Sequence, residues 1–362
     1  MTDAPGPDVI EVSIFGPGKG ESVVVHLGQG EWIIVDSCVN QRTREIPALA
    51  YLDRIGVDVG TQVRLVVATH AHNDHFAGIS RVFECCESAD FVCQTALVSE
   101  QFHALVEMDK RLFPQGRASA FSEYRKVFEL IKRRAAARGG VRPMKWAIQQ
   151  RTLLERGDSV RVLALSPTDE AQARSQQALA DAWSAAQADG KMRPINPNEL
   201  AVALWIEAGG KAILLGADLL TGPAGCGWGA ILGFFVPATR ASVFKVPHHG
   251  SSTAHHDGVW ERLLVDDPVA VLAPYRAGTS PVPGPDDRKR ICSLTSKAFI
   301  TARPDLPRPS KAVRREGADV GPLAQNVREP WGVPGHVRAR CGPGTDAWTV
   351  ETFPPAYRLH AA

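Results

Sequence analysis

The segment from Thr69 to Gly78 constrains most strongly what this chain can fold into and do. It reads THAHNDHFAG and places His70, His72, Asp74 and His75 within six residues, directly after the apolar run 63–68. Imidazole and carboxylate together suit zinc, and also iron or manganese. His70 and His72 are two residues apart, so an extended stretch can direct both toward one ion. A polar surface loop is the alternative, but such clusters seldom arise without a site.

Two further strand ends carry side chains of the same kind. Leu214–Asp218 is an apolar run that ends in a carboxylate, and Val246–Ser252 places His248 and His249 after another short strand. Taken alone, the aspartate would be read as a helix cap or turn residue, and the histidine pair could be a solvated turn. Because strand ends at one edge of a layered α/β fold converge on one crevice, the three segments together favour a shared site.

Hydrophobic patterning predicts a mixed α/β protein with two sheets and outer helices. Alternating or apolar runs predict strands at 9–15, 22–27, 31–36, 63–68, 160–165 and 242–246, and a hairpin around Gly209-Gly210. Helical spacing predicts helices at 43–55 and 169–189, and two more within an inserted segment at 100–138.

Composition excludes a mostly disordered chain and a membrane-spanning one. Of the 362 residues, 44% are hydrophobic and 22% charged, and no apolar run is long enough to cross a bilayer. The start, MTDAPGPD, has no basic region before an apolar one, and the seven cysteines form no CxxC pair. We therefore expect a cytoplasmic protein with reduced thiols. The net charge of +2 argues neither for nor against a nucleic-acid partner.

These motifs resemble the metallo-β-lactamase fold superfamily, whose HxHxDH signature the segment at 70–75 meets in full. Within it the chain most resembles the metallohydrolase domain of the competence protein ComEC/Rec2 group. Three features carry this likeness: the Gly-rich hairpin at 16–36 ending in Asp-Ser, the Asn-led hairpin at 198–218, and the His-His-Gly-Ser motif within 244–251. The resemblance implies an αββα sandwich of two mixed sheets with outer helices over residues 9–300, followed by a Pro/Arg-rich extension at 301–362.

The resemblance also implies a role for each matching residue. It assigns His70 and His72 to a first metal, Asp74, His75 and His248 to a second, Asp218 to a bridge, His249 to an alternative ligand or hydrogen-bond donor, and Asp36 to support of the signature loop. Asp74 and His249 are the catalytic candidates, with Asp74 orienting a water. The further histidine that most members have is missing, since no histidine occurs between 104 and 247. Asn198 stands near the place where that ligand is expected.

A two-metal centre of this kind implies a hydrolase that uses a metal-activated hydroxide. Two divalent ions are expected, zinc first, with manganese or iron as alternatives. The relatives point to a phosphodiesterase or nuclease acting on nucleotide or nucleic-acid substrates. A β-lactam, thioester or lipid ester is an alternative substrate, because the same hydroxide attacks them all. A non-catalytic metal-dependent regulatory module is the other alternative, in which the missing histidine marks lost chemistry.

The inserted segment at 100–138 could bear on substrate choice. It carries nine basic and five acidic side chains, unlike the near-neutral whole. As a lid over the site it would attract an anionic substrate. A surface helical hairpin remote from the site is an equally weighted alternative.

Overall fold

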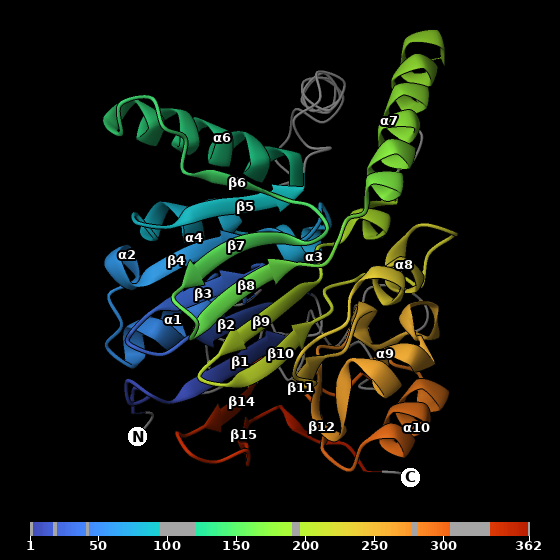
Figure 1. The fold of residues 1–362 in the computed structure, drawn as a ribbon. Helices are drawn as coiled ribbons and strands as arrows, with labels where there is room; N and C mark the ends of the chain where they lie inside the picture. The colour runs from blue at the N-terminus through green and yellow to red at the C-terminus, as the bar shows by residue number, and fades with distance from the viewer. Residues whose placement is uncertain are drawn as a thin grey trace, which may run out of the picture.

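The computed structural model describes residues 3–16, 20–40, 43–94, 120–189, 196–276, 281–304 and 334–360. Two mixed sheets of eight described strands each pack face to face, and helices cover their outer faces (Figure 1). This four-layer arrangement confirms the predicted α/β sandwich. Within the described residues, no helix has the length and apolar character needed to cross a membrane.

The first sheet has the order β15-β14-β1-β2-β3-β4-β5-β6. Its strands are β1 (Ile10–Gly16), β2 (Ser22–His26), β3 (Trp32–Val35), β4 (Val63–Val67), β5 (Asp90–Gln94), β6 (Met144–Ala147), β14 (Gly335–Cys341) and β15 (Thr349–Phe353). The second sheet has the order β16-β13-β12-β11-β10-β9-β8-β7. Its strands are β7 (Arg151–Arg156), β8 (Val160–Ala164), β9 (Leu204–Ala208), β10 (Lys211–Leu215), β11 (Ala241–Lys245), β12 (Leu264–Leu272), β13 (Ala298–Ile300) and β16 (Tyr357–Arg358).

The helices fall into two groups along the chain. Those before residue 140 are α1 (Pro47–Arg54), α2 (Val59–Gln62), α3 (Asn73–Phe76), α4 (Ile79–Cys85) and α6 (Ala120–Ala137). Those that follow are α7 (Asp169–Asp189), α8 (Gly227–Phe234), α9 (Asp257–Arg262) and α10 (Pro285–Leu294), with short 3₁₀ turns η2 (Pro197–Leu200), η3 (His248–Gly250) and η4 (Ser252–Ala254). In Figure 1, α7 projects away from the sheets.

Both faces of the central strands are buried, which explains their continuous apolar sequences. Ile33 of β3 points into the core between the two sheets, whereas the next residue, Ile34, packs with the residues of α1 and α4. In the second sheet, Ile213 lies in the same central core and Leu214 packs outward against Trp228 of α8. The fold therefore has one core between the sheets and one beneath each helical layer.

The predicted strands of the first 250 residues are confirmed within a residue or two at most ends. The hairpin β9–β10 turns at Gly209 and Gly210, whose φ angles of 55° and 75° are left-handed, as a two-residue turn of this type requires. The predicted helix at 169–189 corresponds to α7, and the one at 43–55 begins later, at Pro47. Of the insertion at 100–138, α6 is described, and its residues 100–119 lie outside the described part of the chain.

The separate extension expected after residue 300 has to be corrected. β14 pairs antiparallel with β1, placing Val337 opposite Ile14, and β15 continues the sheet beyond it. β16 pairs with β13 at the edge of the second sheet. Both sheets therefore include strands from the C-terminal region, and the domain boundary at residue 300 does not hold. The Pro- and Arg-rich composition near 303–315 concealed the alternating strand pattern that follows it.

Candidate metal centre

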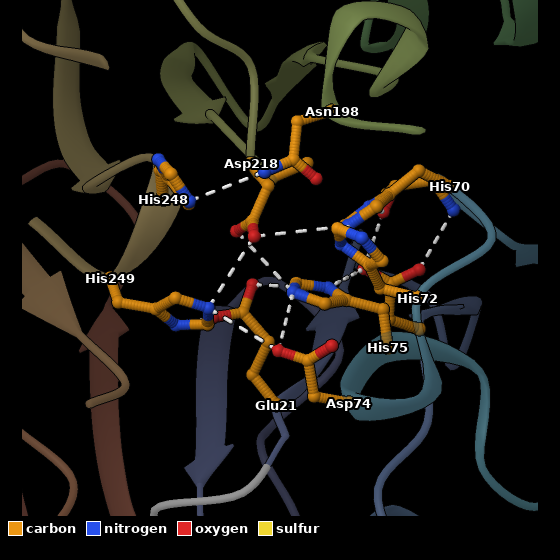
Figure 2. Close-up of polar contacts among 12 residues, drawn as sticks. Glu21, His70, His72, Asp74, His75, Asn198, Asp218, His248 and His249 are labelled. Atoms are coloured by element: carbon orange, nitrogen blue, oxygen red, sulfur yellow. Dashed lines mark hydrogen bonds and ion pairs between the residues drawn. The ribbon is translucent and has the colours of Figure 1, made fainter. Parts of the chain in front are cut away.

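The three predicted ligand segments meet at one edge of the sandwich. The HxHxDH segment follows β4 of the first sheet, whereas Asp218 and His249 follow β10 and β11, which are neighbouring parallel strands of the second. A backbone hydrogen bond of 3.1 Å from Val202 N to Thr69 O joins the two sheets beside this edge. Figure 2 shows the imidazole and carboxylate groups pointing toward one another from both sides.

Two groups of potential metal ligands share the carboxylate of Asp218. Within each group, ligand atoms lie within 4.8 Å of one another. The first group is His70, His72 and Asp218, and the second is Asp74, His75, Asp218 and His249. One buried aspartate is thus shared by two candidate cation sites.

In the first group the histidine nitrogens converge. Nε2 of His70 lies 3.2 Å from Nδ1 of His72 and 3.8 Å from Oδ2 of Asp218. Nδ1 of His70 lies 3.0 Å from Oγ1 of Thr69, which fixes the ring and leaves Nε2 facing the group. The side chain of His72 is only half-buried, whereas that of His70 is fully buried.

In the second group the contacts centre on two carboxylates. Nε2 of His75 lies 3.3 Å from Oδ1 of Asp218 and 3.8 Å from Oδ2 of Asp74. Nε2 of His249 lies 3.4 Å from both Asp74 Oδ2 and Asp218 Oδ2. Nδ1 of His249 contacts the carbonyl oxygen of Ala273 at 2.9 Å, so its second nitrogen is also engaged.

Several residues at this edge have a left-handed backbone that non-glycine residues seldom adopt. The φ angles are 59° at Asp36, 45° at Ala217, 48° at His248 and 57° at His249. Each of them follows the end of a strand within a few residues; Ala217 directly precedes Asp218, and His248 directly precedes His249. Strain of this kind persists where the surrounding structure holds it in place, and it gathers at functional sites.

Asp36 makes the contacts that a supporting residue needs. Its carboxylate accepts hydrogen bonds from Thr69 N at 2.8 Å and from Thr69 Oγ1 at 2.7 Å. It also lies 2.8 Å from Nδ1 of His75. Because that nitrogen is engaged by a carboxylate, Nε2 of His75 is the one that remains for a cation.

The geometry favours His249 over His248 as the ligand of the second group. His248 was assigned to the second metal and His249 was the alternative, yet His249 stands in the cluster. Nε2 of His248 instead lies 3.2 Å from Nδ2 of Asn198, and its Nδ1 lies 2.9 Å from Oγ1 of Thr253. Two adjacent residues in the same backbone conformation direct their rings differently, which the motif alone did not reveal.

Two buried charged residues beside the cluster were missed by the sequence analysis. Glu21 is 2% exposed and lies 3.6 Å from Nδ1 of His75 and 3.7 Å from Nδ1 of His249. Lys245 is 1% exposed and forms an ion pair with Glu21. For Lys245 the available signal was a lysine between Phe244 and Val246, at the end of a mostly apolar strand.

The cluster concentrates negative charge in a buried place. Burial lowers the pKa of His75 and His249, but the carboxylates around them, above all Asp218, outweigh it, so the pKa of His249 rises to about 10 and that of His75 rises well above its usual value. Burial raises the pKa of Asp218, and the two imidazoles outweigh that effect and hold it well below its usual range. The site thus attracts positive charge, supplied by protons or by metal cations.

The residues present fit metal cations. Nε2 of His75 and Oδ1 of Asp218 are buried and, among the described residues, have no hydrogen-bond partner. The Nδ1 atoms of His70, His75 and His249 are each occupied by an oxygen atom, which orients their Nε2 atoms inward. Imidazole nitrogens and carboxylate oxygens form a donor set that suits zinc, iron and manganese.

The two mixed sheets with outer helices are consistent with a metallo-β-lactamase fold. Residues 15–85 match the family model described as the metallo-beta-lactamase superfamily, which supports the expected relation and extends from the end of β1 to the end of α4. No curated protein matches the chain.

The chain is also matched by solved structures, at low sequence identity and low TM-score. The metallo-beta-lactamase fold protein YhfI from Bacillus subtilis is 10% identical, with a TM-score of 0.37, over 82% of this chain and 97% of that protein. The Zn(2+)-bound PqqB from Methylobacterium extorquens is 15% identical, with a TM-score of 0.31, over 62% of this chain and 58% of its own. A metallo beta lactamase from Hirschia baltica is 11% identical, with a TM-score of 0.27, over 60% of this chain and 70% of that protein.

Proposed function

We propose that this protein is a two-metal hydrolase that cleaves phosphodiester bonds in nucleotide or nucleic-acid substrates. One observation carries the proposal: two groups of ligand atoms, both including side chains of the HxHxDH loop, share the buried carboxylate of Asp218. A pair of cations about 3.5–4 Å apart is the arrangement that phosphatases and nucleases use for in-line displacement. Zinc is the proposed metal, with manganese or iron as alternatives.

The proposed ligands form two candidate cation sites. His70, His72 and Asp218 would hold one cation, and Asp74, His75, Asp218 and His249 would hold the other. When bound, two such cations polarise a phosphoryl oxygen and lower the pKa of a bound water from about 15.7 toward about 7. The protein's own contribution is to fix these side chains before the substrate arrives.

Asp74 is the residue of the second group best placed to position an attacking water. Its side chain is 14% exposed, compared with 0% for His75, 2% for Asp218 and 4% for His249. One of its oxygens, Oδ2, lies within 3.4 Å of Nε2 of His249. A partly exposed carboxylate beside the ligand cluster can accept a hydrogen bond from water and orient it toward substrate.

Asn198 supports the more specific relation to the ComEC/Rec2-like proteins. Asn198 is buried beside His248 instead of being a histidine, and its Oδ1 atom has no hydrogen-bond partner within the described ranges. The substrate proposal follows from the same relation: an anionic phosphodiester complements two bound cations. Other esters and amides, including β-lactams and thioesters, are the alternatives that the substrate screen separates.

The test is a metal analysis of gently purified protein combined with a substrate screen. Bis-p-nitrophenyl phosphate, DNA, RNA and cyclic nucleotides are compared with a neutral p-nitrophenyl ester and a β-lactam, with Asp74→Ala as the control. Metal-dependent turnover of a phosphodiester that the control lacks supports the proposal. Turnover confined to the neutral ester or the β-lactam contradicts the substrate class, and metal binding without any turnover indicates a regulatory module.

A further inference from the structure

A buried ion pair lies directly behind the second ligand group. Glu21 precedes β2 of the first sheet, and Lys245 ends β11 of the second, so the pair spans both sheets at the edge of the site. Both side chains are almost completely inaccessible, at 2% and 1% exposure. Burying two charges is unfavourable unless their partners are well placed. The contacts of Glu21 and Lys245 therefore indicate which groups the pair stabilises.

Glu21 lies behind two ligand histidines at once. Its Oε1 lies 3.6 Å from Nδ1 of His75, and its Oε2 lies 3.7 Å from Nδ1 of His249 (Figure 2). Each Nδ1 already has a closer oxygen, from Asp36 and Ala273 respectively, so Glu21 acts on the two rings through its charge. Oε2 of Glu21 has no hydrogen-bond partner among the residues described.

Glu21 is also fixed to the loop that carries Asp74. Its backbone nitrogen donates to Asp74 O at 3.0 Å. The residue before it, Gly20, has a φ of 113°, and a Cβ built there would lie 2.4 Å from the same carbonyl oxygen. Only glycine permits this close approach, so the Gly-Glu sequence places the carboxylate against the HxHxDH loop.

Lys245 reaches the bridging aspartate from the other side. Its Nζ donates to the carbonyl oxygen of Ala217 at 2.9 Å and lies 4.0 Å from Oδ1 of Asp218. Ala217 has a left-handed φ of 45°, and the next residue is Asp218. The lysine therefore stabilises the strained turn that presents the bridging carboxylate.

We propose that Glu21 and Lys245 are a positioning pair that sets the geometry and metal affinity of the second site. The proposal rests on the metal centre proposed above. Neither residue contacts substrate. Glu21 places negative charge behind His75 and His249, which strengthens both imidazoles as ligands, and Lys245 holds the turn before Asp218 and balances that charge. Carboxylates behind ligand histidines commonly tune metal affinity in this way.

The experiment compares single and paired substitutions in the full chain. The variants are Glu21→Gln, Lys245→Met and the pair together, which removes both charges and leaves neither unbalanced. The control is the paired Glu11→Gln/Arg340→Met variant, because Arg340 Nε donates to buried Glu11 Oε2 at 2.7 Å in strands β1 and β14. That ion pair supports the first sheet and touches none of the proposed ligands.

The readouts do not depend on turnover. Metal-free protein is titrated with Zn²⁺ against a chromophoric chelator, and the Co²⁺-substituted protein is examined by its d–d absorption bands. The paired Glu21/Lys245 variant should bind the first ion as the wild type does and the second about 10- to 100-fold more weakly, with altered Co²⁺ bands. The Glu11/Arg340 control should retain both affinities and the wild-type bands.

Wild-type affinity and wild-type Co²⁺ bands in the paired variant would overturn the proposal and reduce the ion pair to a structural element. Should that variant fail to unfold cooperatively, Glu21→Asp decides the question, since it keeps the charge and withdraws the carboxylate by one methylene. In Glu21→Asp the affinity for the second metal ion should fall, and an unchanged affinity for that ion overturns the proposal. A wild type that binds two ions without hydrolysis contradicts the proposed function alone, whereas one that binds none contradicts both.

Discussion

Nε2 of His75 and Oδ1 of Asp218 face each other across 3.3 Å, both buried. In the part of the chain that the structure describes, neither atom has a hydrogen-bond partner. Leaving such groups unsatisfied is costly, and a shared cation removes that cost. These two atoms come from different sheets, so a cation between them would also tie the two halves of the sandwich together.

Metal should therefore stabilise the protein as well as activate it. We expect elemental analysis to find up to two transition-metal ions per chain, zinc first. Because a ligand that binds only the native state raises stability, Zn²⁺ at about 100 times its dissociation constant should add about 2.7 kcal/mol to the free energy of unfolding per site. Denaturant unfolding with and without chelator measures this. The absence of metal after gentle purification, with no thermal shift on adding Zn²⁺ or Mn²⁺, would refute the prediction.

The adjacent histidines provide a matched pair of substitutions. His249→Ala should reduce binding at the second site, because His249 Nε2 contacts both Asp74 and Asp218. His248→Ala should leave both ions bound, since that ring contacts Asn198 and Thr253. Metal stoichiometry by mass spectrometry compares the two. The reverse pattern would mean that His248 is the ligand after all.

Asp74→Ala should abolish hydrolysis while the fold survives. Asp74 is the most exposed carboxylate of its group and contributes to no hydrophobic core cluster. We expect a loss in kcat of at least 100-fold, which is the smallest effect typical of a removed acid–base group. Cooperative unfolding by circular dichroism should remain. Retained turnover would show that the water is oriented elsewhere.

Sequence patterning predicted the strand that leads to each ligand segment, because each strand is apolar on both faces. It also predicted which residue types would meet, since strand ends share an edge. Which of His248 and His249 faces the cluster depends on the left-handed backbone at both residues, with φ angles of 48° and 57°. The spacing of apolar residues in the sequence does not encode these angles.

Long-range pairing limited the rest of the prediction. β14 lies beside β1 although more than 300 residues separate them, as in the pairing of Ile10 with Cys341. Glu21 and Lys245 meet across two sheets, and neither belongs to a short motif. Such contacts depend on the order of strands in the sheets, which local sequence does not specify.

Acid stability should depend on His336, a buried histidine that is 5% exposed. Its ring stacks between Phe15 and Phe353, and burial, followed by the charge of Arg338, lowers its pKa well below the usual value. The folded protein therefore keeps this histidine neutral while the unfolded chain takes up a proton below pH about 6.5. Stability is lost as the pH falls from that value toward the folded pKa, by about 1.4 kcal/mol per pH unit.

The variant His336→Gln tests this contribution. In the presence of chelator, the free energy of unfolding should fall less steeply than in the wild type below about pH 6.5, by a difference that approaches the slope given above as the pH drops further. His360 is exposed, so His360→Gln should keep the wild-type slope. Equal slopes in all three proteins would assign the acid sensitivity to other groups.

Arg134 and Arg133 separate a structural role of α6 from a role as a lid. The Arg134 guanidinium donates to the carbonyl oxygens of Phe83, Glu84 and Cys86 at 2.6, 3.2 and 3.1 Å, and it lies 4.2 Å from the Phe83 ring centroid. It thus caps the C-terminal end of α4, where a positive charge is favoured. Arg133 is 71% exposed and lies 3.8 Å from a Glu84 oxygen.

We therefore expect the two arginines to behave differently. Arg134→Ala should lower the free energy of unfolding by about 1–3 kcal/mol, the range for hydrogen bonds of a charged group. Arg133→Glu should change it by no more than about 0.5 kcal/mol, as most exposed substitutions do. Because both residues lie at the C-terminal end of α4, away from the signature loop that precedes it, Arg133→Glu should also leave kcat/KM for a phosphodiester and its salt dependence unchanged. A selective fall in kcat/KM for the anionic substrate, with a neutral ester spared, would instead place this end of α6 in the path of the substrate.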